Sequence, residues 1–209
     1  MKYDSKVVAF KSKRNKVFFD GELVEKHLHT KEAAALEAGE LQRLNSAGLR
    51  VPKIILCDNN VVKMDFINGE TLPDLIERLE KEDSIGNTRV IETVAHELVI
   101  WLRDFYKAVN TEKTNQIRGD VNGRNFIFDS ACIWGVDFEE MAFGEKEQDI
   151  GRLLAFITTY DPADTPLKKR LTSDVSEEAV KVLNITQEKI KIYMEAELDA
   201  ITLRRRGLN

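Results

Sequence analysis

The chain has only two cysteines in 209 residues, and they lie far apart, at Cys57 and Cys132. Two isolated cysteines do not make a disulfide framework, and they lack the spacing of a metal site. We therefore expect a reducing compartment, the cytoplasm. No segment approaches the roughly 18 apolar residues of a membrane span. The first five residues are polar, so we expect neither a membrane anchor nor a signal sequence.

A strong excess of one charge is also lacking. The 31 basic and 36 acidic residues leave a net charge of −5. This balance argues against nucleic-acid binding through bulk charge, although a local basic patch would be compatible with it. The hydrophobic share of 43% is ordinary for a globular protein and sufficient for a core. The length suits one large domain or two small lobes.

The most informative stretch is R-G-D-V-N-G-R-N over residues 118–125. Two short apolar runs follow it, over residues 126–128 and 133–136, with a turn at 129–130 between them. This pattern predicts a β-hairpin. The hairpin would return Asp137, which follows the second run, to the neighbourhood of Asp120 and Asn125.

Two carboxylates and one amide would then converge on one place. Asp and Asn oxygens suit Mg²⁺, which usually takes one or two carboxylates together with substrate phosphates. A carboxylate outside the metal shell can orient a hydroxyl group and accept its proton. The alternative is that these residues only form turns, in which Asp, Asn and Gly are common.

These motifs resemble the protein-kinase-like fold, in particular the aminoglycoside phosphotransferase and choline kinase branch. That branch reads roughly H-G-D-x-x-x-x-N, then a strand pair, then D-F/W-E/D. The resemblance implies that Asp120 is the catalytic base, that Asn125 and Asp137 are Mg²⁺ ligands, and that Glu139 supports the metal. The sequence departs from the pattern at Arg118, where the family usually has His.

The N-terminal part is expected to form three antiparallel strands, over residues 7–10, 16–19 and 23–28, as in the small lobe of a kinase. The loop 11–15 contains no glycine, so a glycine-rich phosphate loop is absent. The loop and Lys16 carry cationic side chains. These would either lie near ATP phosphates or form a solvated hairpin tip.

The third strand carries Lys26, at the position where the fold places the lysine that holds the α- and β-phosphates. Its alternation partners are apolar, and a lysine on an apolar face needs a partner. A helix is predicted over residues 31–45, with Thr30 as its N-cap and Gly48 as its terminator. Glu37 shares a face with apolar residues of this helix, and its spacing from Gly48 and Pro52 resembles that of the family, so the resemblance implies that Glu37 is the partner of Lys26. Glu40 is the rival.

Two further strands are expected over residues 51–56 and 60–67. The stretch 64–72 resembles the family's hinge, where backbone groups around Met64, Asp65 and Ile67 would hold adenine. We place the domain boundary at residue 68. Residues 1–68 are then the N-terminal nucleotide-binding lobe, and residues 69–209 are the C-terminal catalytic helical lobe.

Helices are predicted over residues 71–81, 88–109, 149–157, 176–183 and 187–205. Asp149 is interpreted as the N-cap of the third of these helices, and an ion pair between Arg118 and Asp149 is the alternative. The last helix ends in three arginines, 204–206, which suit the negative end of the helix dipole without any ligand.

We therefore predict an α+β, two-lobed kinase-like fold that binds Mg-ATP and transfers the γ-phosphoryl group to a hydroxyl of a small molecule, of the amino-sugar, sugar or amino-alcohol type. Acidic residues either line a site for a cationic acceptor or form a solvated surface; these are Asp161, Asp164, Glu195, Glu197 and Asp199. One alternative is a small atypical kinase or ATPase of the RIO or KEOPS-complex type, which would have a protein partner. Another is a nucleotide-binding protein without catalysis.

Overall fold

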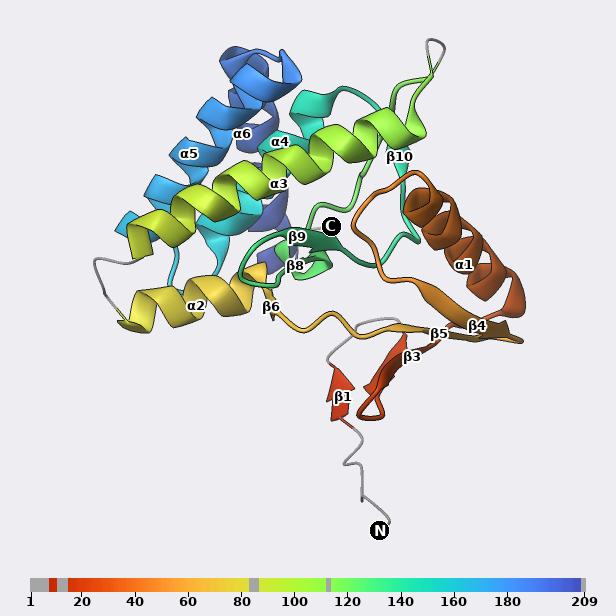
Figure 1. Cartoon of the computed structure of the whole chain (residues 1–209). Coiled ribbons are helices and arrows are strands. Elements are labelled where there is room, and N and C mark those ends of the chain that lie inside the picture. The colour runs from red at the N-terminus through yellow and green to blue at the C-terminus, as the bar shows by residue number, and fades with distance from the viewer. Residues whose placement is uncertain (1–7, 11–14, 83–86, 112–113, 208–209) are drawn as a thin grey trace. The chain divides into compact units, whose positions relative to one another are not determined.

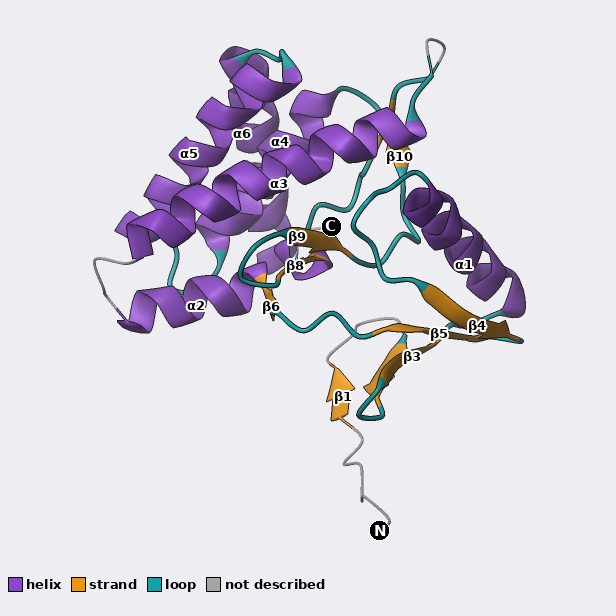
Figure 2. Ribbon diagram, viewed as in Figure 1, coloured by secondary structure: helices purple, strands orange, loops and turns teal. Residues whose placement is uncertain are grey.

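The chain folds into an N-terminal antiparallel sheet with one helix and a mostly helical C-terminal part, an α+β arrangement (Figures 1 and 2). The structure is a computed structural model that describes residues 8–10, 15–82, 87–111 and 114–207. It divides into two units. The first contains Met1–Asn68 and Gly135–Glu139, and the second contains Gly69–Trp134 and Glu140–Asn209.

The sheet of the first unit has the strand order β1-β2-β3-β5-β4. All four pairings are antiparallel. Helix α1 (Lys31–Ser46) packs against β4 and β5. The strands are β1 (Val8–Phe10), β2 (Lys16–Phe19), β3 (Leu23–His27), β4 (Ile54–Asp58) and β5 (Val61–Asp65).

Local signals explain where α1 begins and ends. The Thr30 side chain accepts a hydrogen bond from the Ala33 N–H, so the predicted N-cap is present. After the helix, Gly48 has φ +82°, a left-handed conformation that favours glycine. The apolar face of α1, which includes Leu41 and Leu44, is buried in the core of this unit.

The helices of the second unit form its bulk, and α3 packs along α5 while α4 packs along α6 (Figure 1). The core is aromatic where α3 meets β8, because the Trp101 ring lies 5.6 Å from that of Phe105 and 5.4 Å from that of Phe126. The helices are α2 (Leu72–Glu82), α3 (Asn87–Val109), α4 (Lys146–Thr159), α5 (Pro166–Leu183) and α6 (Gln187–Arg205).

Short strands position the loops of this unit. Strands β6 (Glu70–Thr71), β8 (Phe126–Phe128) and β9 (Ile133–Gly135) form one sheet, in which β8 is bonded to β9. The predicted strand pair is therefore present. Asp129 closes its turn, since its Oδ1 accepts from two backbone N–H groups, those of Ala131 and Cys132. Strands β7 (Gln116–Ile117) and β10 (Ala142–Phe143) pair with each other.

Two predicted helix starts are wrong. Helix α5 begins at Pro166 rather than at residue 176, because Thr165 caps it through the Lys168 N–H and proline suits the first helical turn. Helix α4 begins at Lys146 with Glu145 as its N-cap residue. Asp149 therefore lies inside the helix and is not its cap.

The segment Gly135–Glu139 belongs to the first unit, whereas the sequence analysis assigned it to the C-terminal lobe. The Gly135 N–H donates to the Arg50 carbonyl at 3.0 Å, and two acidic residues of the segment contact Lys26.

In the described chain, no helix is both long and apolar enough to cross a membrane. The predicted loop cations at 11–14 lie outside the described residues.

Candidate active site

A buried ion pair forms the centre of the first unit's polar cluster. Lys26 on β3 is 5% exposed, and its Nζ lies 2.8 Å from Oε1 of Glu37 on α1. The rival Glu40 instead contacts Arg43 on the surface of the same helix. The structure thus contains the lysine–glutamate pair that the sequence analysis expected.

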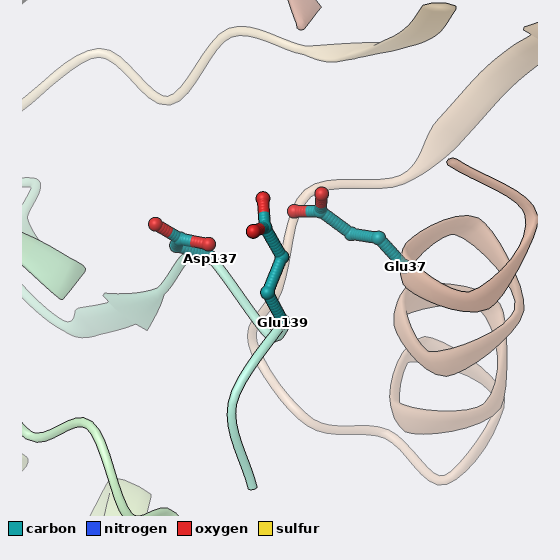
Figure 3. Close-up of side chains that lie close together, drawn as sticks. All are labelled: Glu37, Asp137 and Glu139. Carbon is teal, nitrogen blue, oxygen red and sulfur yellow. The ribbon is translucent and has the colours of Figure 1, made fainter. Parts of the chain in front are cut away.

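Two more carboxylates surround the same ammonium group. The Nζ of Lys26 lies 2.7 Å from Oε1 of Glu139 and 3.0 Å from Oδ1 of Asp137. Figure 3 shows the carboxylates of Glu37, Asp137 and Glu139 turned toward one another. The amide of Asn15 donates to Glu139 and holds it in place. The sequence offered no signal for Asn15, which precedes a strand and resembles an ordinary loop residue.

Burial and charge act in opposite directions on this cluster. Burial raises the pKa of Glu37, while the Lys26 charge opposes that rise. For Lys26 burial favours a lower pKa, but Glu37 and then Asp137 outweigh it and hold the pKa above its ordinary value. Lys26 is therefore protonated at neutral pH. Three carboxylates around one cation leave excess negative charge when they are ionised.

The donor set fits a hard cation. One oxygen from each of the three carboxylates lies within 4.8 Å of the others. Within the described part of the chain, Oε2 of Glu37 is buried and has no hydrogen-bond partner. Oxygen ligands of this kind are those that Mg²⁺ takes. Of these three carboxylates, those of Asp137 and Glu139 belong to the residues that the sequence analysis expected to hold the metal.

Asp137 has an unusual backbone conformation, with φ +64°. Aspartate tolerates the left-handed region better than most residues, but such a conformation still costs on the order of 1–3 kcal/mol. Strain of this kind clusters at ligand sites. Here it occurs at the residue whose carboxylate contacts Lys26.

The second unit holds the loop that contains Asp120. Oδ1 of Asp120 accepts from the Asn122 N–H at 3.1 Å, and the Asp120 carbonyl accepts from Nδ2 of Asn125 at 3.3 Å. Asn125 ends the 3-10 helix η1 (Gly123–Asn125) and is 7% exposed. Because the amide nitrogen of Asn125 is used within the loop, its amide oxygen is the atom to offer to a cation. The expectation that Asp137 lies close to Asp120 and Asn125 in one site stays a prediction.

Asp149 braces the start of this loop from α4. Its Oδ2 accepts from the Arg118 N–H at 2.7 Å and from the Tyr106 hydroxyl at 3.0 Å, and its Oδ1 accepts from the Gly119 N–H at 3.0 Å. Burial raises the pKa of Asp149, and these donors oppose the rise. The contact to Arg118 thus includes its backbone, where the sequence analysis considered only a side-chain ion pair.

Gly119 is required by its conformation and its surroundings. Its φ is +76°, and a Cβ atom there would lie 3.1 Å from Cβ of Ala142 and 3.2 Å from the Glu140 carbonyl oxygen. A larger residue would therefore displace the loop just before Asp120. Tyr106, which sequence reasoning treated only as part of a helix, is the third donor to the brace.

The expected adenine-binding residues lie at the end of β5. Met64 is buried at 6% exposure. The Asp65 N–H already donates to the Lys53 carbonyl at 3.0 Å. Ile67 follows the strand and is half-buried. An adenine-binding role for these three residues stays a prediction.

Solved structures with the same fold include aminoglycoside phosphotransferases and a choline/ethanolamine kinase family protein. The gentamicin complex of aminoglycoside phosphotransferase APH(2'')-IIa matches with a TM-score of 0.58 and 14% identity, over 97% of this chain and 86% of that one. ADP-bound APH(2'')-Ib matches with a TM-score of 0.56 and 14% identity, over 85% and 79%. A choline/ethanolamine kinase family protein from Mesorhizobium loti matches with a TM-score of 0.54 and 14% identity, over 98% and 82%.

These likenesses show the fold, which is that of the protein-kinase-like phosphotransferases. Residues 2–153 match the model of the RIO domain, and the chain belongs to the RIO domain family. A search of curated proteins finds no match. Family and fold together identify a kinase, and the predicted fold is confirmed. The family match falls on the group that the sequence analysis gave as its alternative.

Proposed function

We propose that the protein binds Mg-ATP and transfers the γ-phosphoryl group to a hydroxyl group of a small molecule. The observation that carries the proposal is the cluster of Lys26, Glu37, Asp137 and Glu139, with its four charges within contact distance. Such a cluster combines a cation for phosphates with oxygen ligands for a metal.

Each residue has a role in this proposal. Glu37 positions Lys26, which binds the α- and β-phosphates. Asn125 and Asp137 are the Mg²⁺ ligands, and Glu139 supports the metal. Bound Mg²⁺ would neutralise charge on the phosphates. Backbone groups of the segment after Met64 hold adenine, although the Asp65 N–H is already bonded to the Lys53 carbonyl.

Asp120 is the proposed base. Its loop is braced by Asp149, and one of its carboxylate oxygens accepts from the Asn122 N–H. Asp120 would orient the acceptor hydroxyl and accept its proton. The acceptor oxygen then forms a bond to the γ-phosphorus, the bond between that phosphorus and the bridging oxygen breaks, and ADP leaves.

A direct test is to measure the Kd of Mg-ATP by calorimetry and ADP formation in the presence of candidate acceptors. We expect binding that requires Mg²⁺ and ADP formation that requires an acceptor. The Glu40→Gln variant serves as the control, since Glu40 lies on the same helix and pairs only locally with Arg43. If the unaltered protein does not bind Mg-ATP, the proposal is refuted.

Family membership favours a second candidate, in which the acceptor is a protein or the chain is the ATPase of an assembly. Mg-ATP binding does not distinguish the two candidates. Transfer of labelled γ-phosphate does, because the label would appear in protein rather than in a small compound. Binding without any turnover would instead indicate the nucleotide-binding protein without catalysis.

A further inference from the structure

A hollow of about 290 Å³ lies in the second unit beside the loop that contains Asp120. One wall is the end of α4, another is the last turn of α6, and the third is the loop itself. Among the residues that line it are Asn122, Thr159, Tyr160, Ile201, Arg204 and Arg205.

The hollow is connected to Asp120 by hydrogen bonds. The Asn122 N–H donates to Oδ1 of Asp120, and the Tyr160 hydroxyl lies 3.4 Å from Oδ1 of Asn122. The Tyr160 hydroxyl also accepts from the Gly123 N–H at 2.8 Å. Burial, aided by the charge of Asp120, raises the pKa of Tyr160 to about 12, so this hydroxyl is neutral at physiological pH. The wall of the hollow is thus part of the loop that carries the proposed base.

Arginines dominate the charged groups at this wall. The Nη2 of Arg204 lies 2.5 Å from Oε1 of Glu197, and the Nε of Arg152 lies 3.7 Å from Oε2 of the same glutamate. The Nη2 of Arg205 donates to the Thr159 carbonyl at 2.7 Å. Among the described residues Arg205 has no carboxylate in ion-pair contact. Of the two arginines that line the hollow, Arg204 is paired with Glu197, whereas Arg205 has no carboxylate partner among the described residues, which leaves positive charge at the mouth of the hollow.

Carboxylates that would suit a cationic acceptor are absent from the described lining of the hollow. None of the five considered in the sequence analysis, all of them described, lines this hollow. Asp164 pairs with Lys169 at 3.0 Å, and Glu195 pairs with Lys191 at 3.8 Å. The structure therefore provides no carboxylate lining to the hollow for an amino-sugar.

We infer that this hollow is the acceptor site and that it takes a small hydroxyl compound bearing a carboxylate or phosphate group, which Arg205 binds. The inference rests on the proposed function and names the class of its acceptor. Ligand pockets start at about 300 Å³, so the hollow suits a small compound such as a single sugar phosphate or a hydroxy acid. Guanidinium groups bind carboxylate and phosphate through charge-assisted hydrogen bonds.

The test compares compounds with one carbon skeleton and different charge. One set is glucose 6-phosphate, glucose and glucosamine; another is glycerol phosphate, glycerol and 3-amino-1,2-propanediol. With Mg-ATP present, ADP formation should rise above its basal rate with the anionic members. In Arg205→Gln the KM for an active anionic compound should rise about tenfold or more while the Kd of Mg-ATP stays unchanged.

Arg206→Gln is the matched control, since it removes the same charge one residue further along and Arg206 does not line the hollow. Inorganic phosphate supplies a second readout without turnover. It should raise the melting temperature of the unaltered protein and of Arg206→Gln, but not that of Arg205→Gln.

The inference is overturned if the amino compounds or only proteins stimulate ADP formation. It is also overturned if no compound does so, or if the two arginine variants behave alike. If the unaltered protein does not bind Mg-ATP, the proposed function fails instead. The phosphate-induced shift in melting temperature then still decides whether the hollow binds anions through Arg205.

Discussion

Lys26 and Glu37 form a buried ion pair that joins β3 to α1, with 2.8 Å between Nζ and Oε1 and side-chain exposures of 7% and 1%. The pair is not isolated, because Asp137 and Glu139 contact the same ammonium group. The position of Lys26 therefore depends on groups from three separate stretches of the chain.

Replacing Glu37 by Gln should impair ATP use about as much as replacing Lys26 by Met. Both changes act through one contact, and a misplaced phosphate-binding group can cost up to about a hundredfold in rate. The double variant should be little worse than either single variant, because the two residues are coupled. The measurement is kcat/KM for ATP. Glu40→Gln should be mild, and an equal effect at Glu40 would contradict the assignment.

Asp120→Asn should lower turnover by about 10²- to 10⁴-fold, which is the usual contribution of a positioned acid or base. The change keeps the shape of the side chain and its bond to the Asn122 N–H. Mg-ATP affinity should be largely retained, since a base acts mainly in the transition state. Steady-state rates and calorimetry separate the two effects. A parallel loss of nucleotide binding would make Asp120 a metal ligand or a structural residue.

Asp137→Ala should abolish most of the rise in melting temperature that Mg-ATP produces, because only the folded state has the site. The measurement is a thermal shift with ATP in the presence of Mg²⁺ and again with a chelator. The unaltered protein should lose its shift with the chelator, whereas the variant should give a small shift in both conditions. A full shift in Asp137→Ala would rule out its role as a metal ligand.

Asp149→Asn should destabilise the fold by about 1–3 kcal/mol. The Asp149 carboxylate accepts three hydrogen bonds, and an amide would place its NH₂ group against one of the donors. Turnover should fall as well, because the brace supports the loop next to Asp120. Urea unfolding measures the first effect. Tyr106→Phe removes one of the three donors and is the milder change. Its free energy of unfolding should lie between those of Asp149→Asn and the unaltered protein.

Lys168→Met should lower the free energy of unfolding by about 3 kcal/mol. The Lys168 side chain is 1% exposed, and its Nζ contacts Glu80 of α2 at 2.8 Å and the Pro162 carbonyl at 2.6 Å. The neighbouring Lys169 is the control. It is 63% exposed and, among the described residues, is paired only with Asp164, so Lys169→Met should change stability by less than about 1 kcal/mol. Equal effects in urea unfolding would show that the Glu80 contact does not support the packing.

Elements with strong local signals were predicted well. Strand β2 and helix α1 occur where alternation and helical periodicity placed them, and Thr30 caps α1. Periodicity placed both Glu37 and Glu40 beside apolar residues, and the spacing of Glu37 from Gly48 and Pro52, which resembles the family's, decided between them. Such features depend on residues within a few positions of one another.

The errors occurred where distant contacts outweigh local pattern. Asp149 looked like a helix cap, but its partners are the backbone of Arg118 and Gly119 and the hydroxyl of Tyr106, all far away in sequence. Helix α5 was placed too late because its polar first half lacks a clear apolar stripe. Thr165 as a cap and Pro166 in the first turn were the available signals for its true start.

The sequence by itself determined the kinase-like order of motifs, the α+β class and the residues proposed to carry the chemistry, because these depend on residue type and spacing along the chain. Only the tertiary structure decided that one ammonium group is shared by three carboxylates and that Asp149 braces the Asp120 loop. It also decided that arginines rather than acids line the hollow beside that loop. The physical reason is that these arrangements join side chains and backbone groups from distant segments, whose approach depends on packing of the whole unit and not on any local pattern.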